Sequence, residues 1–286
     1  MPMTPALWTN MFARQSPPEA LRSLARVGWP AAEMSCDHAA LLRNNDGLIE
    51  SCASAVAETG LLVPQMHLML KANLASLDEA ARAGDIQSVT DDINTCAKLD
   101  IPVGVIHPGG FHDVNTYEEW ERMSETRQES FGRIAEVAAE KGVRIAIEHM
   151  FDQGQGVHGH RRFGGTVDDV LELCAQVAPQ QLGICFDASH GHLGGMNLAE
   201  CIRRCGEKLW ALHVSDNYGD VDRHYIPGNG SIEWGPVVAA LREIGYEGPF
   251  VLETWNLNTG GASDPSELEL GAGYALDVAK KMLELY

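Results

Sequence analysis

The feature that most constrains the fold of this chain is a repeat of short apolar runs, each followed by turn residues and a helix-like segment. The runs have the aliphatic and β-branched composition of buried strands. Strands that alternate with amphipathic helices form parallel sheets, because each helix serves as a crossover connection. We predict strands within residues 5–12, 31–36, 62–70, 103–109, 144–150, 182–190, 209–216 and 249–255.

The helix-like segments carry their own start signals. Residues 16–19 (Ser-Pro-Pro-Glu) and 264–267 (Asp-Pro-Ser-Glu) each offer an N-cap, a proline in the first turn and a glutamate that can reach back. Further N-cap pairs are Thr116–Glu119, Thr166–Asp169 and Asn197–Glu200. These signals support a helix after most of the predicted strands.

Repeated strand–helix units without a break in composition predict one closed α/β barrel, a (β/α)8 TIM barrel that spans residues 1–286 as a single domain. A length of 286 residues is normal for such a barrel. No GxGxxG follows the first strand, which argues against an open dinucleotide-binding sheet. No linker or low-complexity tract divides the chain.

The charge balance argues against a nucleic-acid partner. Lys and Arg number 21 against 40 Asp and Glu, a net charge of −19, whereas nucleic-acid binding depends on cations that neutralise phosphates. We also expect no membrane span and no secretory signal, because no apolar run has the required length or position. The cysteines are scattered without a CxxC, as expected for buried thiols in a reducing cytoplasm.

Polar residues lie at the ends of four consecutive predicted strands. Glu148, Asp187 and Glu253 close theirs, and His213 lies near the end of the seventh. A parallel barrel builds its active site at the carboxyl ends of its strands. Buried carboxylates repel one another and lose hydration, so such a cluster needs a compensating cation. We therefore predict that these four residues bind a divalent metal through mixed oxygen and imidazole ligands.

Alternation along the strands is compatible with ligands that face the barrel interior. Glu148 shares one side of its strand with the small residue Ala146. His213 likewise shares a side with Ala211, opposite the bulky Trp210.

Further polar residues are expected at the same end of the barrel. They come from the third, fourth and sixth strands and from the loop after the seventh. These residues are His67, His107, His190, Asp222 and His224. Each can bind a metal or substrate, or be an ordinary hydrogen-bonded residue, and both interpretations stay open. Glu33, Asp37 and His38 are weaker candidates.

The runs FDASHGH (186–192), LHVSDNYGDVDRHYIPGNGSIEW (212–234) and FVLET (250–254) resemble the xylose isomerase-like barrel superfamily of sugar phosphate isomerases and epimerases. The resemblance extends over the whole chain through strand order, and its specific part is residues 145–255. It implies that Glu148, Asp187, His213 and Glu253 bind a divalent metal. In the ketose epimerase branch the two glutamates also form the acid–base pair, and the histidine that corresponds to His190 contacts substrate.

The resemblance thus predicts a metal-dependent isomerase or epimerase of a sugar or sugar phosphate, with about one ion of Mn²⁺, Zn²⁺, Co²⁺ or Mg²⁺ per chain. One glutamate would remove an α-proton to form an enediolate and the other would return it. We expect Arg223 to contact a hydroxyl or phosphate group, and Trp8 and Trp255 to provide apolar walls. The expected partner is a small carbohydrate, and pairing through outer helices would allow a homo-oligomer.

Two alternatives from other functional classes stay open. The same superfamily holds endonuclease IV, a phosphoesterase whose three-zinc site adds histidines on strands three and four and an Asp-x-His pair. His67, His107, Asp222 and His224 match those positions. The net charge of −19 and the scarcity of basic and aromatic residues after the second strand argue against a DNA enzyme. The other alternative is a barrel that binds sugar without catalysis.

Overall fold

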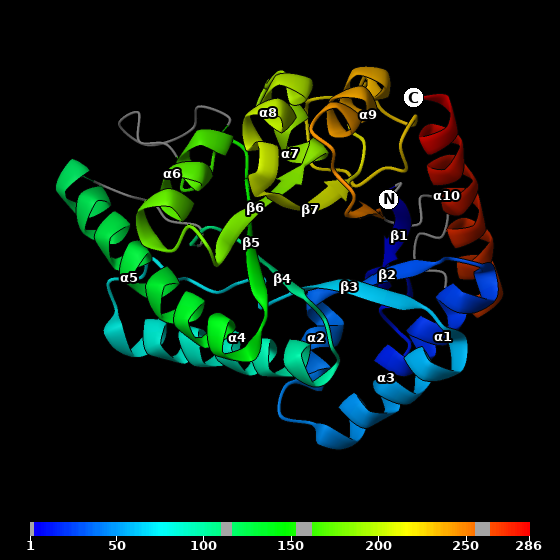
Figure 1. The fold of residues 1–286 in the computed structure, drawn as a ribbon, viewed down its shortest axis with the longest axis horizontal. Coiled ribbons are helices and arrows are strands. Elements are labelled where there is room, and N and C mark those ends of the chain that lie inside the picture. The colour runs from blue at the N-terminus through cyan, green and yellow to red at the C-terminus, as the bar shows by residue number, and fades with distance from the viewer. Residues whose placement is uncertain (1–2, 110–115, 153–161, 255–263) are drawn as a thin grey trace.

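The computed structural model describes residues 3–109, 116–152, 162–254 and 264–286. Within these ranges eight parallel strands form a closed barrel, in which each strand pairs with the next and β8 pairs with β1 (Figure 1). The strands are β1 (Thr4–Trp8), β2 (Ala31–Met34), β3 (Leu62–His67), β4 (Val103–Ile106), β5 (Arg144–Glu148), β6 (Leu182–Asp187), β7 (Leu209–Val214) and β8 (Pro249–Leu252). The predicted TIM barrel is confirmed.

The helices surround the barrel (Figure 1). They are α1 (Pro17–Val27), α2 (Cys36–Leu42), α3 (Asp46–Thr59), α4 (Glu79–Lys98), α5 (Tyr117–Lys141), α6 (Val167–Val177), α7 (Ala188–Leu193), α8 (Leu198–Cys205), α9 (Trp234–Glu243) and α10 (Pro265–Leu285), with the short 3-10 helices η1 (Thr9–Phe12) and η3 (Gly206–Lys208). None of the helices in the described part of the chain is long and apolar enough to span a membrane.

The helix starts follow the capping chemistry read from the sequence. Ser16 and Glu19 form a capping box at the start of α1, in which the backbone N–H of Ser16 donates to Glu19 Oε2 at 3.0 Å. Thr116 Oγ1 accepts a hydrogen bond from the backbone N–H of Glu119 at the start of α5. Gly142 ends that helix with φ of 70°, a left-handed conformation that glycine adopts without strain.

The barrel strands contribute residues to two hydrophobic clusters, one on each side of the sheet. The larger one lies between strands and helices and contains Ile145 and Ile147 of β5. A smaller one, inside the barrel, contains Ala146 and Ala211. The small residues that precede Glu148 and His213 on the same side of their strands therefore face the interior, as the alternation predicts.

Trp210 departs from that alternation. It packs against the inner cluster, whereas the sequence places it on the opposite side of β7 from Ala211. The β6–β7 register shifts between Ile184 and Cys185, and this irregularity turns the indole inward. Gly183 makes room for it, because a Cβ there would overlap the Trp210 ring.

Candidate metal centre

Four polar side chains from four consecutive strands meet at the carboxyl ends of those strands. Glu148 and Asp187 are the last residues of β5 and β6, His213 is the fifth residue of β7, and Glu253 directly follows β8. All four are buried. One ligand-type atom from each of the four lies within 4.8 Å of those of the other three. These are the four residues that the sequence pattern predicts as metal ligands.

The centre of this group is Nδ1 of His213. It lies 3.2 Å from Glu148 Oε1, 3.2 Å from Glu253 Oε2 and 3.9 Å from Asp187 Oδ2. Among the described residues, Asp187 Oδ2 has no hydrogen-bond partner. A buried carboxylate oxygen without a donor is costly unless a cation compensates it. These oxygen and imidazole donors therefore fit a divalent metal.

The electrostatics of the group favour a positive charge at its centre. Burial raises the pKa of Asp187 to about 7, against the attraction of His190. Burial also opposes ionisation of Glu148, but the neighbouring charge of His213 and hydrogen bonds from imidazoles hold the pKa of Glu148 well below its usual range. The pKa of His213 is raised well above its usual range: burial lowers it, and the surrounding acidic groups outweigh that effect.

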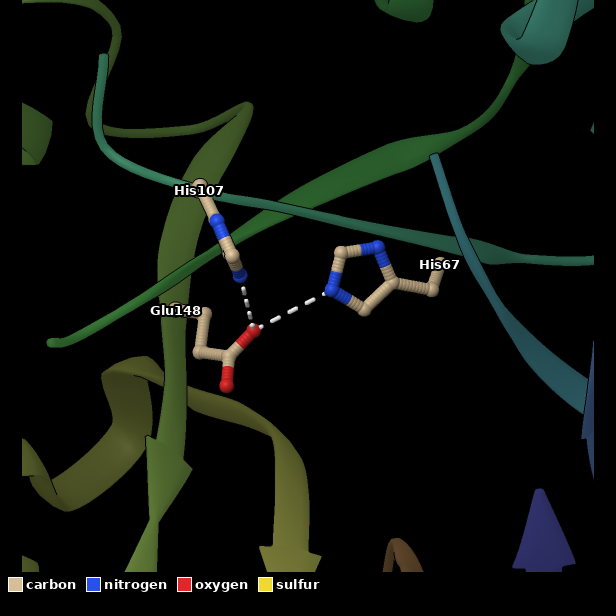
Figure 2. Close-up of side chains that lie close together, drawn as sticks. All are labelled: His67, His107 and Glu148. Atoms are coloured by element: carbon tan, nitrogen blue, oxygen red, sulfur yellow. Dashed lines mark hydrogen bonds and ion pairs between the residues drawn. The ribbon is translucent and has the colours of Figure 1, made fainter. Parts of the chain in front are cut away.

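A second group forms around the other oxygen of Glu148. Figure 2 shows Glu148 Oε2 between two imidazoles, 3.2 Å from His67 Nε2 and 3.3 Å from His107 Nε2. His67 ends β3 and His107 directly follows β4. Because Oε1 faces His213 and Oε2 faces this pair, one carboxylate is shared by two groups of potential ligands.

A third group gathers around Asp222. Its Oδ2 lies 3.4 Å from His190 Nε2 and 3.2 Å from His224 Nε2. The Nδ1–H of His190 donates to the backbone oxygen of His149 at 3.0 Å, and that of His224 donates to the backbone oxygen of Glu253 at 2.9 Å. Both rings are thereby held with Nε2 toward Asp222. The structure thus brings together all nine polar residues singled out at the strand ends and in the loop after β7.

Residues 21–282 match the model of the xylose isomerase-like TIM barrel family. The chain belongs to this family. The match confirms the resemblance carried by residues 186–192, 212–234 and 250–254.

Relatives of this xylose isomerase-like barrel include sugar epimerases and endonucleases. D-psicose 3-epimerase of Enterocloster bolteae is 25% identical over 98% of this chain and 89% of that protein. A probable endonuclease 4 of Cenarchaeum symbiosum is 26% identical over 79% of this chain and 80% of that protein. Among solved structures, a D-tagatose 3-epimerase-like protein aligns with a TM-score of 0.82 at 23% identity, over 99% of this chain and 98% of that one.

Trp8, Arg223 and Trp255, the substrate contacts predicted from the sequence of this xylose isomerase-like barrel, differ from one another in their surroundings. The Trp8 ring stacks on His224, with centroids 5.7 Å apart and planes 6° from parallel, and its Nε1–H donates to the backbone oxygen of Thr254. Arg223 instead pairs with Asp220 at 2.7 Å and is partly exposed. Trp255 lies outside the described residues. Trp8 therefore borders the third group of the centre, whereas the guanidinium of Arg223 is engaged with Asp220.

Two further buried residues, Glu33 and His149, lie beside the centre. Glu33, a weak candidate from the sequence, has its Oε2 2.9 Å from His213 Nε2, whereas the sequence does not single out His149. His149 is fully buried beside Phe186, its Nε2 has no hydrogen-bond partner among the described residues, and burial lowers its pKa to about 4. The available signal for Glu33 is an acidic residue inside a strand of otherwise apolar residues.

Proposed function

We propose that this barrel is a divalent-metal-dependent isomerase or epimerase that acts on a sugar or sugar phosphate. One observation carries the proposal: carboxylate oxygens of Glu148 and Glu253 both lie 3.2 Å from the same atom, His213 Nδ1. An enediolate mechanism needs one group to remove a proton and another to return it beside the same substrate atoms. Two carboxylates that converge from β5 and from the end of β8 meet that need. The sugar epimerases among the relatives support the assignment.

The donors proposed to hold the metal are Glu148, Asp187, His213 and Glu253. The orphaned Oδ2 of Asp187 and the mixed oxygen and nitrogen chemistry fit such an ion. When bound, a divalent ion would act as a Lewis acid toward negative charge that develops on the substrate oxygens.

In this proposal the carboxylates of Glu148 and Glu253 carry out the proton transfers. One of Glu148 and Glu253 removes the proton next to the substrate carbonyl, which leaves an enediolate. The other glutamate returns a proton to the opposite face of the same carbon in epimerisation, whereas a proton returned to the former carbonyl carbon gives isomerisation. His190 and Arg223 are the proposed contacts to substrate hydroxyl or phosphate groups, and Trp8 a proposed apolar wall.

Turnover in deuterated water tests this proposal. Ketoses and their phosphates are incubated with Mn²⁺-loaded protein in D₂O, and products are followed by NMR. We expect at least one substrate to give an isomer or epimer that carries deuterium at the carbon where the proton was exchanged. Glu253→Gln should yield no product, while the exposed Glu58→Gln serves as the matched control. Full turnover by Glu253→Gln would overturn the acid–base assignment.

A second candidate function is a phosphoesterase that uses two or three metal ions. The observation that favours it is the pair His67 and His107 at Glu148 Oε2, together with the cluster around Asp222. Ions held there would add positive charge that can stabilise the transition state of phosphate ester hydrolysis.

Metal content read together with turnover separates the candidates. Elemental analysis of purified protein should give about one ion per chain for the isomerase and two to three for the phosphoesterase. Hydrolysis of bis-p-nitrophenyl phosphate without any ketose conversion would favour the phosphoesterase. A sugar that raises the melting temperature without any turnover would instead favour a non-catalytic sugar-binding barrel.

A further inference from the structure

Glu33 lies in β2, at a distance in sequence from every proposed ligand, yet its carboxylate reaches into the centre. It is fully buried, and its Oε2 lies 2.9 Å from Nε2 of His213. The side-chain amide of Gln65, on the neighbouring β3, donates to the same Oε2. Glu33 Oε1 has no hydrogen-bond partner among the described residues. Glu33 therefore sits behind the imidazole, on the side away from Glu148 and Glu253.

The direction of the Glu33–His213 hydrogen bond follows from its neighbour. The amide nitrogen of Gln65 can only donate, so Glu33 Oε2 acts as an acceptor toward it. The same oxygen then accepts from His213, which places a proton on Nε2. A metal-binding imidazole is neutral and carries a single N–H, so with that proton on Nε2 the lone pair is on Nδ1. Nδ1 is the atom that faces the carboxylates of Glu148, Asp187 and Glu253.

We propose that Glu33 is a positioning residue for the metal centre, which holds His213 in the Nε2–H tautomer so that Nδ1 is the metal ligand. The inference rests on the metal site of the proposed function and extends it to a residue that contacts no metal. A carboxylate that accepts the distal N–H of a metal-binding histidine fixes the ring and raises its basicity. Loss of such a partner typically weakens metal binding by about 10- to 100-fold.

Three variants separate this role from simple space filling. Glu33→Gln keeps the size and an acceptor oxygen but removes the charge, and Glu33→Met keeps similar bulk without any acceptor. Asp92→Asn is the matched control. Asp92 is likewise fully buried, and its carboxylate is satisfied by Arg43 at 2.9 Å on both oxygens, with no contact to the cluster. Circular dichroism and thermal unfolding of the metal-free proteins verify that each variant folds.

The first readout is Co²⁺ affinity, measured on metal-free protein by visible absorption with a competing chelator. We expect the dissociation constant to rise about tenfold or more in Glu33→Gln, and further in Glu33→Met. Asp92→Asn should leave it unchanged. Equal affinities, within twofold, for wild type and both Glu33 variants would overturn the positioning role while the proposed metal site stands.

The second readout needs no Glu33 variant. NMR of Zn²⁺-loaded protein with ¹⁵N-labelled histidine reports the tautomer of each ring, and His213→Asn identifies the signal of residue 213. We expect a protonated Nε2 and a metal-bound Nδ1. A metal-bound Nε2 in wild type would overturn the inference alone. Failure of wild-type protein to bind Co²⁺ or Zn²⁺ at all would instead overturn the proposed function, and the inference with it.

Discussion

Asp187 Oδ2 lies 3.9 Å from His213 Nδ1, a separation at which no hydrogen bond joins the two side chains. The two residues are Cα partners in the β6–β7 ladder, so the strand register brings them to the same level of the barrel. The other oxygen of Asp187, Oδ1, accepts the backbone N–H of His190 at 2.7 Å and caps α7. One oxygen therefore orients the side chain, and the other is directed at the proposed ion.

Asp187→Asn separates metal binding from folding. Asparagine keeps the Oδ1 cap but replaces the orphaned Oδ2 with an amide nitrogen, which cannot bind a cation. We expect the metal dissociation constant to rise at least about tenfold. The metal-free variant should be more stable than metal-free wild type, because an uncompensated buried carboxylate is removed. Each 1 kcal/mol gained should raise the melting temperature by about 2–4 °C. Calorimetry with and without Zn²⁺ measures both effects; tighter metal binding in the variant would contradict the site.

Asp92→Asn should lower the stability of the protein, in contrast to metal-free Asp187→Asn, because the buried carboxylate of Asp92 already has hydrogen-bond partners. It accepts hydrogen bonds from Arg43 and from the backbone N–H of Met69. We expect the free energy of unfolding in urea to fall by about 1.5–3 kcal/mol. Asp46→Asn removes the exposed partner of Lys98 and should cost less than about 1 kcal/mol. Equal losses of unfolding free energy in the two variants would contradict the prediction that the buried ion pair of Asp92 contributes more than the exposed pair of Asp46.

His67→Ala and His107→Ala test which group of ligands holds the ion. Both imidazoles contact Glu148 at Oε2. If the four-residue group holds the single ion of an isomerase, elemental analysis of each variant should still give about one ion per chain. A loss of one ion relative to wild type would show that the pair holds a metal of its own, as the phosphoesterase alternative requires.

Gly183→Ala tests the packing of Trp210 inside the barrel. A methyl group at this position would overlap ring carbons of Trp210, so we expect a loss of about 1–3 kcal/mol in urea unfolding. Gly132→Ala, in the interior of α5, meets only Val177 at 3.7 Å and should instead gain about 0.5–1 kcal/mol. If Gly183→Ala were as stable as wild type, the indole would not be packed against Gly183.

Much of the architecture could be predicted because its signals are local. The alternation of Ala146 and Glu148 along one strand indicates which side faces the interior, and the structure places small residues such as Ala146 and Ala211 there. The Ser16–Glu19 pair likewise predicts a helix start, since both partners of a capping box lie within one turn. Strand order then predicts that Glu148 and Asp187 lie near each other, because neighbouring parallel strands end together.

The remaining features depend on contacts between distant residues. Every residue of β2 is buried, so the pattern around Glu33 does not distinguish a side chain that faces the barrel interior from one under a helix. Its partner His213 is 180 residues away in the chain. The inward turn of Trp210 comes from a register shift between β6 and β7. The register of a strand depends on its partner and cannot be predicted from the sequence of that strand alone.

Anomalous scattering from crystals grown with Zn²⁺ tests the central claim most directly. The account predicts a strong peak about 2.0–2.2 Å from ligand atoms of Glu148, Asp187, His213 and Glu253, with Nδ1 as the histidine donor. The absence of a peak among these four residues, in crystals whose surface carboxylates bind Zn²⁺, would contradict it.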